Sequence, residues 1–246
     1  MTPQVRRYGN LEDLNRAAAQ YICDAARECV NAKGIFSLVL SGGKTPETLY
    51  ACLAQPPFDV KFPWEQTHVF WGDERCASPD REESNYGMAQ KAFISKVPLP
   101  PENIYRIPGE MKPPERAAVA YEQTLRRFFQ AHQEADAFPS FDLILLGVGA
   151  DGHIASLFPN HDVLRERKRW VAYVRSPNAI PPVPRITLTF PILNNAAHIL
   201  FLVAGEAKRQ VFQSILGDTQ TIRKDYPAAM LKPRGEVIWF NSQTDC

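Results

Sequence analysis

The sequence predicts an α/β fold with a mostly parallel sheet covered by helices on both faces. Short, continuous apolar segments recur along the chain, as expected for strands that are buried on both faces. Amphipathic helical segments separate several of them, and this alternation is typical of parallel strands joined by crossover helices. The length of 246 residues, without a repeat or a clear linker, suits one such domain. We therefore expect residues 1–246 to form a single α/β domain.

The predicted elements follow from hydrophobic periodicity. Apolar residues recur at spacings of three and four between Leu11 and Cys29, which predicts a helix that Gly34 ends. The same spacing predicts a helix over residues 115–134. The predicted strands are 35–40, 68–71, 141–149, 170–175, 185–190, 198–205 and 237–240.

Charge and composition exclude several classes of partner. The formal net charge is +1, so nothing indicates a nucleic-acid groove or a membrane surface. The N-terminus lacks the apolar segment of a signal peptide, and no stretch is long and apolar enough to span a membrane. We expect a soluble, cytoplasmic protein that binds neither nucleic acid nor membrane.

The cysteines indicate neither a disulfide framework nor a metal site. They form no CxxC pair and have no histidine at metal-ligand spacing, so reduced thiols and no bound metal are expected. The five are Cys23, Cys29, Cys52, Cys76 and Cys246.

The first candidate site loop is Ser41-Gly42-Gly43-Lys44-Thr45-Pro46, which follows a predicted strand and opens a helix. Thr45 suits the N-cap and Pro46 the first helical position. Free N–H groups and the helix dipole would then converge on an anion such as phosphate. A tight turn that needs glycine only for its dihedral angles is the alternative. The spacing is not that of a Walker loop, so ATP is not implied.

The second loop is Gly72-Asp73-Glu74-Arg75, directly after the apolar segment 68–71. Three charges at this place would be costly to bury unpaired. They form either a local ion-pair network or a surface that faces a ligand, and the sequence leaves both open. Downstream, Ser84 is placed to cap a helix.

The third loop, residues 147–153, reads GVGADGH and formally matches the GxGxxG pattern of dinucleotide sites. A dinucleotide site also requires an acidic residue at the end of the next strand, whereas the next apolar segment here ends in Tyr-Val-Arg-Ser. His153 beside Asp151 suggests a general base instead. A purely structural histidine is the alternative. Arg185 and Lys208, each near an element start, would close a phosphate site or else be surface charges.

Known hydrolase signatures do not explain these loops. The chain has no GxSxG elbow and no HExxH motif, so neither a serine hydrolase nor a zinc peptidase is indicated. A histidine with charged neighbours and two glycine turns suits water attack on an activated ester. His153 would take a proton from the water and return it to the leaving oxygen, and N–H groups of a glycine turn would hold the oxyanion.

The chain resembles the glucosamine-6-phosphate isomerase/6-phosphogluconolactonase superfamily along nearly its whole length. The resemblance implies a modified Rossmann-like fold and a phosphosugar site without metal, nucleotide or other cofactor. The segments that carry it, in chain order, are LVLSGGKTPETLY, VFWGDERCASPDREESNYGMAQKAF, NIYRIPGE, FDLILLGVGADGHIASLFP, PRITLTF and LVAGEAKRQVF.

Two positions favour the lactonase branch over the deaminase branch. Deaminases typically read DGHIAFNEP in the third loop, and Phe158 stands here in place of their glutamate. Deaminases also carry a tyrosine where this chain has Arg75. The branch implies hydrolysis of 6-phospho-D-glucono-1,5-lactone to 6-phospho-D-gluconate, the second step of the oxidative pentose phosphate pathway. A phosphosugar-binding protein without activity and an amino-sugar deaminase are the other hypotheses, and the oligomeric state is open.

The resemblance also assigns roles to residues. His153 would be the base and Asp151 would orient it, while Asp73 stands where deaminases place a proton-transfer carboxylate. Lactonases often have an aspartate where this chain has Asn241. The phosphate site would be formed by Ser41, Gly42, Gly43 and Thr45, with Arg75, Arg185 and Lys208 as charged contacts.

Overall fold

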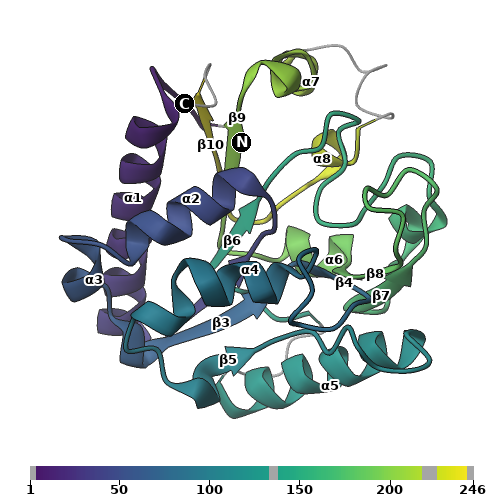
Figure 1. The fold of residues 1–246 in the computed structure, drawn as a ribbon, viewed down its shortest axis with the longest axis horizontal. Helices are drawn as coiled ribbons and strands as arrows, with labels where there is room; N and C mark the ends of the chain where they lie inside the picture. Colours follow the sequence, from purple (N-terminus) through teal and green to yellow (C-terminus); the bar gives the residue numbers. More distant parts are fainter. Residues whose placement is uncertain (1–3, 133–137, 218–225, 243–246) are drawn as a thin grey trace.

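A seven-stranded sheet organises the chain in the computed structural model, which describes residues 4–132, 138–217 and 226–242 (Figure 1). All of its strand pairs are parallel, in the order β1-β10-β9-β6-β2-β3-β5. This confirms the predicted fold class. The strands are β1 (Gln4–Tyr8), β2 (Phe36–Leu40), β3 (Thr67–Trp71), β5 (Ile104–Tyr105), β6 (Leu143–Leu146), β9 (His198–Ala204) and β10 (Glu236–Ser242).

Helices flank this sheet. The first, α1 (Leu11–Lys33), begins where Asn10 accepts a hydrogen bond from the Asp13 N–H and ends at Gly34, whose φ of 82° few other residues adopt. It packs against α2 and β10 (Figure 1). The other α-helices are α2 (Lys44–Leu53), α3 (Phe58–Lys61), α4 (Asn85–Ala92), α5 (Glu115–His132), α6 (Phe190–Asn194), α7 (Glu206–Leu216) and α8 (Pro227–Met230). Short 3-10 turns cover Trp64–Gln66, Ile94–Lys96, Pro101–Asn103 and Asp162–Arg165.

Two predicted strands belong to a second, antiparallel sheet instead. It joins β4 (Asp73–Arg75), β8 (Arg185–Leu188) and β7 (Val171–Val174), which lie together on the right of Figure 1. The segment between β7 and β8 contains no helix, and antiparallel neighbours need only a loop. The pairing of β4 with β8 sets Arg75 opposite Arg185.

The candidate loops meet because their strands are neighbours. The loops follow β2, β3 and β6, which are adjacent in the sheet, and parallel strands present their carboxyl ends at one edge. From β2 the sheet continues to β3, and from β6 it continues the other way to β9. The strand order therefore reverses between β2 and β6, and such a switch point opens a crevice for ligands.

The described residues contain no helix long and apolar enough to cross a membrane. Four of the cysteines are free thiols: Cys23, Cys29, Cys52 and Cys76. Cys246 lies outside the described residues.

Candidate active site

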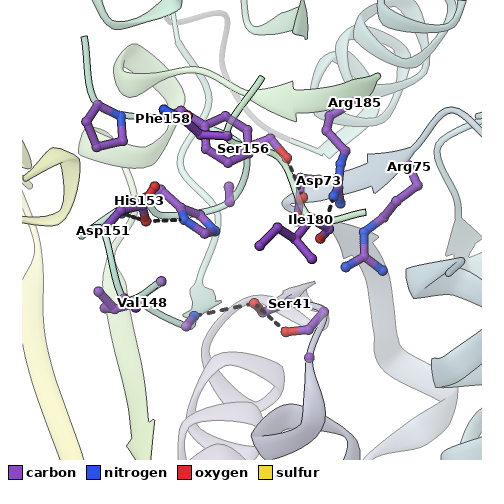
Figure 2. Close-up of a pocket in the computed structure, with 18 of the residues that line it drawn as sticks. Ser41, Asp73, Arg75, Val148, Asp151, His153, Ser156, Phe158, Ile180 and Arg185 are labelled. Atoms are coloured by element: carbon purple, nitrogen blue, oxygen red, sulfur yellow. Dashed lines mark hydrogen bonds and ion pairs between the residues drawn. The ribbon is translucent and has the colours of Figure 1, made fainter. Parts of the chain in front are cut away.

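A cavity of about 680 Å³ opens at the carboxyl ends of β2, β3 and β6. All three candidate loops line it, and Figure 2 shows Ser41, Asp73 and His153 around the same space. Every residue predicted for the site except Thr45 contributes to its wall. These are Ser41, Gly42, Gly43, Asp73, Arg75, Asp151, His153, Arg185 and Lys208.

The glycine loop leads into α2 earlier than the sequence suggested. The helix begins at Lys44, with Gly43 at the N-cap and a φ of 103°. The expected N-cap role of Thr45 is therefore wrong, because the left-handed turn at Gly43 starts the helix before it. Thr45 is buried in the first helical turn, and its carbonyl accepts a hydrogen bond from the Thr48 hydroxyl. Gly43 has no side chain to cap the helix, so the first N–H groups of α2 are left for another acceptor.

One of the three charged residues of the second loop has a structural role, and the other two line the cavity. Glu74 is buried and caps α4, while Asp73 and Arg75 line the cavity. Burial raises the pKa of the Glu74 carboxyl, against the effect of its hydrogen-bond donors. The donors to Glu74 are the Ser84 hydroxyl and the backbone N–H groups of Arg75, Asn85 and Tyr86, at 2.7–3.0 Å. Ser84 also caps α4 as expected, since it accepts from the Gly87 N–H at 3.0 Å.

Asp73 is held by two residues that sequence reasoning missed. The Ser156 hydroxyl donates to Asp73 Oδ2 at 2.6 Å, and Asn85 Nδ2 donates to the Asp73 carbonyl at 2.9 Å. The bond from Ser156 fixes the carboxylate of Asp73, and the bond from Asn85 holds its backbone. The residue is 6% exposed. Ser156 follows the GVGADGH loop and Asn85 follows the cap Ser84. Their closeness to those motifs was the available signal, but only the fold shows that both reach Asp73.

Arg185 is not a surface charge. It is 4% exposed, and burial lowers the pKa of its guanidinium while the charge of Asp73 opposes that shift. Its Nη2 donates to the carbonyls of Ile180 at 2.9 Å and Pro181 at 3.0 Å, and Nε donates to Val183 at 3.2 Å. Arg185 therefore anchors the loop that leads into β8 while it lines the cavity (Figure 2).

Two further cations reach the cavity. Arg75 donates from Nη1 to the Glu83 carbonyl, and its Nε is buried with no partner among the described residues. Lys208 lies in the first turn of α7, as the sequence predicted. Together with Arg185 they give the lining of the cavity three positive groups.

His153 and Asp151 form a hydrogen-bonded pair. His153 Nδ1 lies 2.5 Å from Asp151 Oδ1, and the Phe158 ring packs on the imidazole at a centroid distance of 4.8 Å (Figure 2). Burial acts to raise the pKa of Asp151, but its hydrogen bonds with His153 outweigh burial and leave that pKa below the ordinary value. A carboxylate that accepts from Nδ1 assigns the proton to Nδ1 and the lone pair to Nε2. This arrangement leaves Nε2 of His153 with a lone pair that can accept a proton.

The turn around His153 differs from a dinucleotide loop. No helix begins directly after residues 147–153, and the Gly149 N–H donates to the His153 carbonyl at 2.9 Å. A Cβ on Gly149 would lie 2.1 Å from His153 Nδ1. The glycine at this position is therefore needed for the approach of the imidazole. Among the described residues, no group of three or more His, Cys, Asp or Glu side chains is arranged to hold a metal ion.

Comparison with known proteins gives consistent matches over nearly the whole chain. The family model described as glucosamine-6-phosphate isomerases/6-phosphogluconolactonase matches residues 9–239. A 6-phosphogluconolactonase of Synechocystis sp. is 39% identical over 243 residues, with 99% of this chain and 97% of that protein covered. A probable chloroplastic 6-phosphogluconolactonase 4 of Oryza sativa subsp. indica is 40% identical, with 94% and 72% covered.

Solved structures share the fold. The 6-phosphogluconolactonase from Thermotoga maritima superposes with a TM-score of 0.83 at 29% identity, with 98% of this chain and 100% of that chain covered. A monomeric glucosamine-6-phosphate deaminase gives a TM-score of 0.79 at 22% identity, with 97% of each chain covered. The second match shows only that the fold is common to both activities.

Proposed function

Because the chain belongs to the glucosamine-6-phosphate isomerase/6-phosphogluconolactonase family, we propose that it hydrolyses 6-phospho-D-glucono-1,5-lactone to 6-phospho-D-gluconate, the second step of the oxidative pentose phosphate pathway. The names of the relatives support an enzyme of this type. The observation that carries the proposal is the His153–Asp151 pair in one cavity with the glycine loop and three cations. Cytoplasmic localisation stays a prediction, and some plant relatives are named chloroplastic.

In the proposed mechanism His153 activates water. Nε2 takes a proton from the water as its oxygen attacks the lactone carbonyl carbon, and the carbonyl becomes a tetrahedral oxyanion. When the bond to the ring oxygen breaks, the imidazolium returns the proton to that oxygen. The product is the open-chain acid. Asp151, ionised and bonded to Nδ1, stabilises the transient imidazolium. N–H groups of the turn at residues 147–153, other than those of Gly147, Gly149 and Gly152 that already donate within the protein, would stabilise the oxyanion.

The phosphate would be bound at the other side of the cavity. The uncapped N-terminus of α2 and the peptide groups of Gly42 and Gly43 offer N–H donors to an anion. Arg75 and Lys208 add charge-assisted hydrogen bonds. Arg185 contributes charge from a fixed position, because the carbonyls of its loop hold the guanidinium.

Asp73 would bind a sugar hydroxyl rather than transfer a proton. Its carboxylate already accepts from Ser156, and an ionised carboxylate has further lone pairs to accept from a ligand. Hydrolysis of a lactone requires no proton transfer at a sugar carbon, whereas isomerisation does. An Asp73 carboxylate that is held in place by a hydrogen bond suits lactone hydrolysis, in which it only has to bind a hydroxyl.

Phe158 disfavours the deaminase alternative. Its ring, 3% exposed, lies against His153 at the position where the resembling deaminases carry a glutamate. An apolar ring cannot relay a proton to an amino sugar. Release of ammonia from glucosamine-6-phosphate is therefore expected to stay at background.

The test is lactone hydrolysis with substrate freshly made by glucose-6-phosphate dehydrogenase and with spontaneous hydrolysis subtracted. The parent should accelerate lactone decay, and the His153→Gln variant should bind 6-phosphogluconate but lose turnover. If the parent binds 6-phosphogluconate tightly yet leaves the decay rate unchanged, the chain is a binding protein and the proposal fails. Ammonia release from glucosamine-6-phosphate would show that the deaminase alternative holds.

A further inference from the structure

Two strand ends beside the active site are held by tyrosine hydroxyls rather than by a neighbouring strand. The Tyr50 hydroxyl accepts from the Ser41 N–H at 2.9 Å and donates to the Ser41 carbonyl at 2.8 Å. The Tyr121 hydroxyl makes the same pair of bonds with Trp71, each at 3.0 Å. Both tyrosines are fully buried.

The bonds to Ser41 replace pairing with β6. The Leu40 carbonyl accepts from the Gly72 N–H at 2.9 Å and therefore faces β3. Successive residues of a strand present their polar groups to alternate sides, so the N–H and carbonyl of Ser41 face β6. In the described residues β2 pairs with β6 only at Leu38↔Leu143 and Val39↔Ile144. Beyond these pairs the strands separate, and Tyr50 satisfies the backbone groups that β6 no longer reaches.

A neutral hydroxyl is required for this role. It must donate to one group and accept from another, and a phenolate could only accept. Burial raises the pKa of Tyr50, so the phenol keeps its proton. The ring is also packed, with the Phe93 ring at a centroid distance of 5.2 Å. The oxygen therefore has a fixed place at the gap between β2 and β6.

We propose that Tyr50 is a positioning residue for phosphate binding, whose hydroxyl fixes the peptide of Ser41 so that the glycine loop stands open toward the ligand. This rests on the proposed function, in which the peptide groups of Gly42 and Gly43 bind the phosphate. Without the hydroxyl, two buried backbone groups lose their partner. They regain partners only if the end of β2 moves, for example toward β6, and that movement shifts the N–H groups of Gly42 and Gly43.

Tyr121 offers a matched control because the chain after Trp71 is anchored independently. The Gly72 N–H donates to Leu40 and the Gly72 carbonyl accepts from the Leu188 N–H at 2.8 Å. Asp73, the next residue, pairs with Thr187 in the second sheet. The loss of the Tyr121 hydroxyl should therefore destabilise the fold without moving a ligand group.

The experiment compares Tyr50→Phe with Tyr121→Phe at a temperature well below the lower of their Tm values. Both variants should show a lowered Tm, since each removes the same two hydrogen bonds. Only Tyr50→Phe should raise KM for the lactone and weaken competitive inhibition by inorganic phosphate, by about 10- to 100-fold for a displacement near 1 Å. Its kcat should change little, because His153 lies in another loop.

Three outcomes would overturn the proposal. The first is a Tyr50→Phe variant with the parent KM and the parent inhibition by phosphate. The second is a Tyr121→Phe variant whose KM is raised as much as that of Tyr50→Phe. If Tyr50→Phe does not fold, p-aminophenylalanine at position 50 keeps a donor for the Ser41 carbonyl, and it should fold with a KM closer to the parent. A folded amino variant with no affinity for phosphate is the third outcome.

The failure of this proposal can be told from the failure of the proposed function. A parent that neither hydrolyses the lactone nor binds 6-phosphogluconate overturns the proposed function itself. An active parent with an unaffected Tyr50→Phe variant overturns only the role of Tyr50.

Discussion

Gly149→Ala should impair catalysis without changing any ionisable group. The new Cβ would lie 2.1 Å from His153 Nδ1, 2.2 Å from its Cε1 and 2.7 Å from Asp151 Oδ1. The backbone of Gly149 does not have a positive φ, so the alanine is tolerated in the main chain. The imidazole and its carboxylate partner must move instead.

The displacement sets the size of the effect. Cβ contacts below 3.0 Å essentially never occur, so the ring must move by roughly 1 Å or rotate away from Asp151. A misplacement of about 1 Å costs about 100-fold in rate, or about 2.7 kcal/mol of transition-state stabilisation. The rotation is cheap for folding because only the side chain moves. We expect kcat to fall about 100-fold with a small change in Tm and in KM.

The assay is lactone hydrolysis corrected for the spontaneous rate, with Tm measured on the same preparations. Gly72→Ala is the control, since its Cβ would meet its nearest neighbour, the Leu40 carbonyl, at 3.5 Å, an ordinary contact. Gly72 ends another strand beside the site but does not line the cavity. A Gly149→Ala enzyme within threefold of the parent kcat would mean that the observed position of His153 is not the one used in catalysis.

Three further predictions follow from the same structure. His153→Gln should lower kcat by about 10²–10⁴-fold while 6-phosphogluconate still binds, and near-parental turnover in a folded variant would remove His153 from the mechanism. Arg75→Ala and Lys208→Ala should each raise KM by about 10- to 150-fold, the equivalent of a charge-assisted contact of about 1.5–3 kcal/mol; unchanged 6-phosphogluconate affinity by calorimetry would contradict the site assignment. Burial, with a smaller effect from His132, lowers the pKa of His68 from 6.5 to about 4, so the unfolded chain binds the proton first and stability should fall as pH drops from 6.5 to 4. Urea unfolding at pH 7 and pH 5 should show this fall in the parent and less of it in His68→Phe, and equal falls would assign it elsewhere.

The parallel sheet and its loops could be predicted because hydrophobic pattern and strand order are linked. Segments such as 35–40 and 198–205 are apolar at all but one position, as expected for a strand that is buried on both faces. The loops that follow β2, β3 and β6 then meet by topology alone. The strand β1 escaped prediction, since Gln4–Tyr8 carries two arginines and its residues are exposed or half-buried at the sheet edge.

Long-range partners could not be predicted. The roles of Ser156 and Tyr50 depend on contacts with Asp73 and with the separated end of β2, and no local spacing encodes these. The different roles of two adjacent residues in the second loop could not be predicted either. Glu74 and Arg75 are adjacent charges, and only the position of α4 decides that the carboxylate caps a helix while the guanidinium faces the cavity.

The anchor provided by Arg185 has a consequence for how this enzyme can vary. Its guanidinium binds the carbonyls of Ile180, Pro181 and Val183, and a carbonyl is present whatever the side chain. Ile180 itself is 88% exposed and lines the cavity wall. The contacts that anchor the loop therefore do not depend on the side chain at position 180, and a substitution there would change the surface of the cavity entrance while Arg185 keeps its hydrogen bonds to the loop backbone.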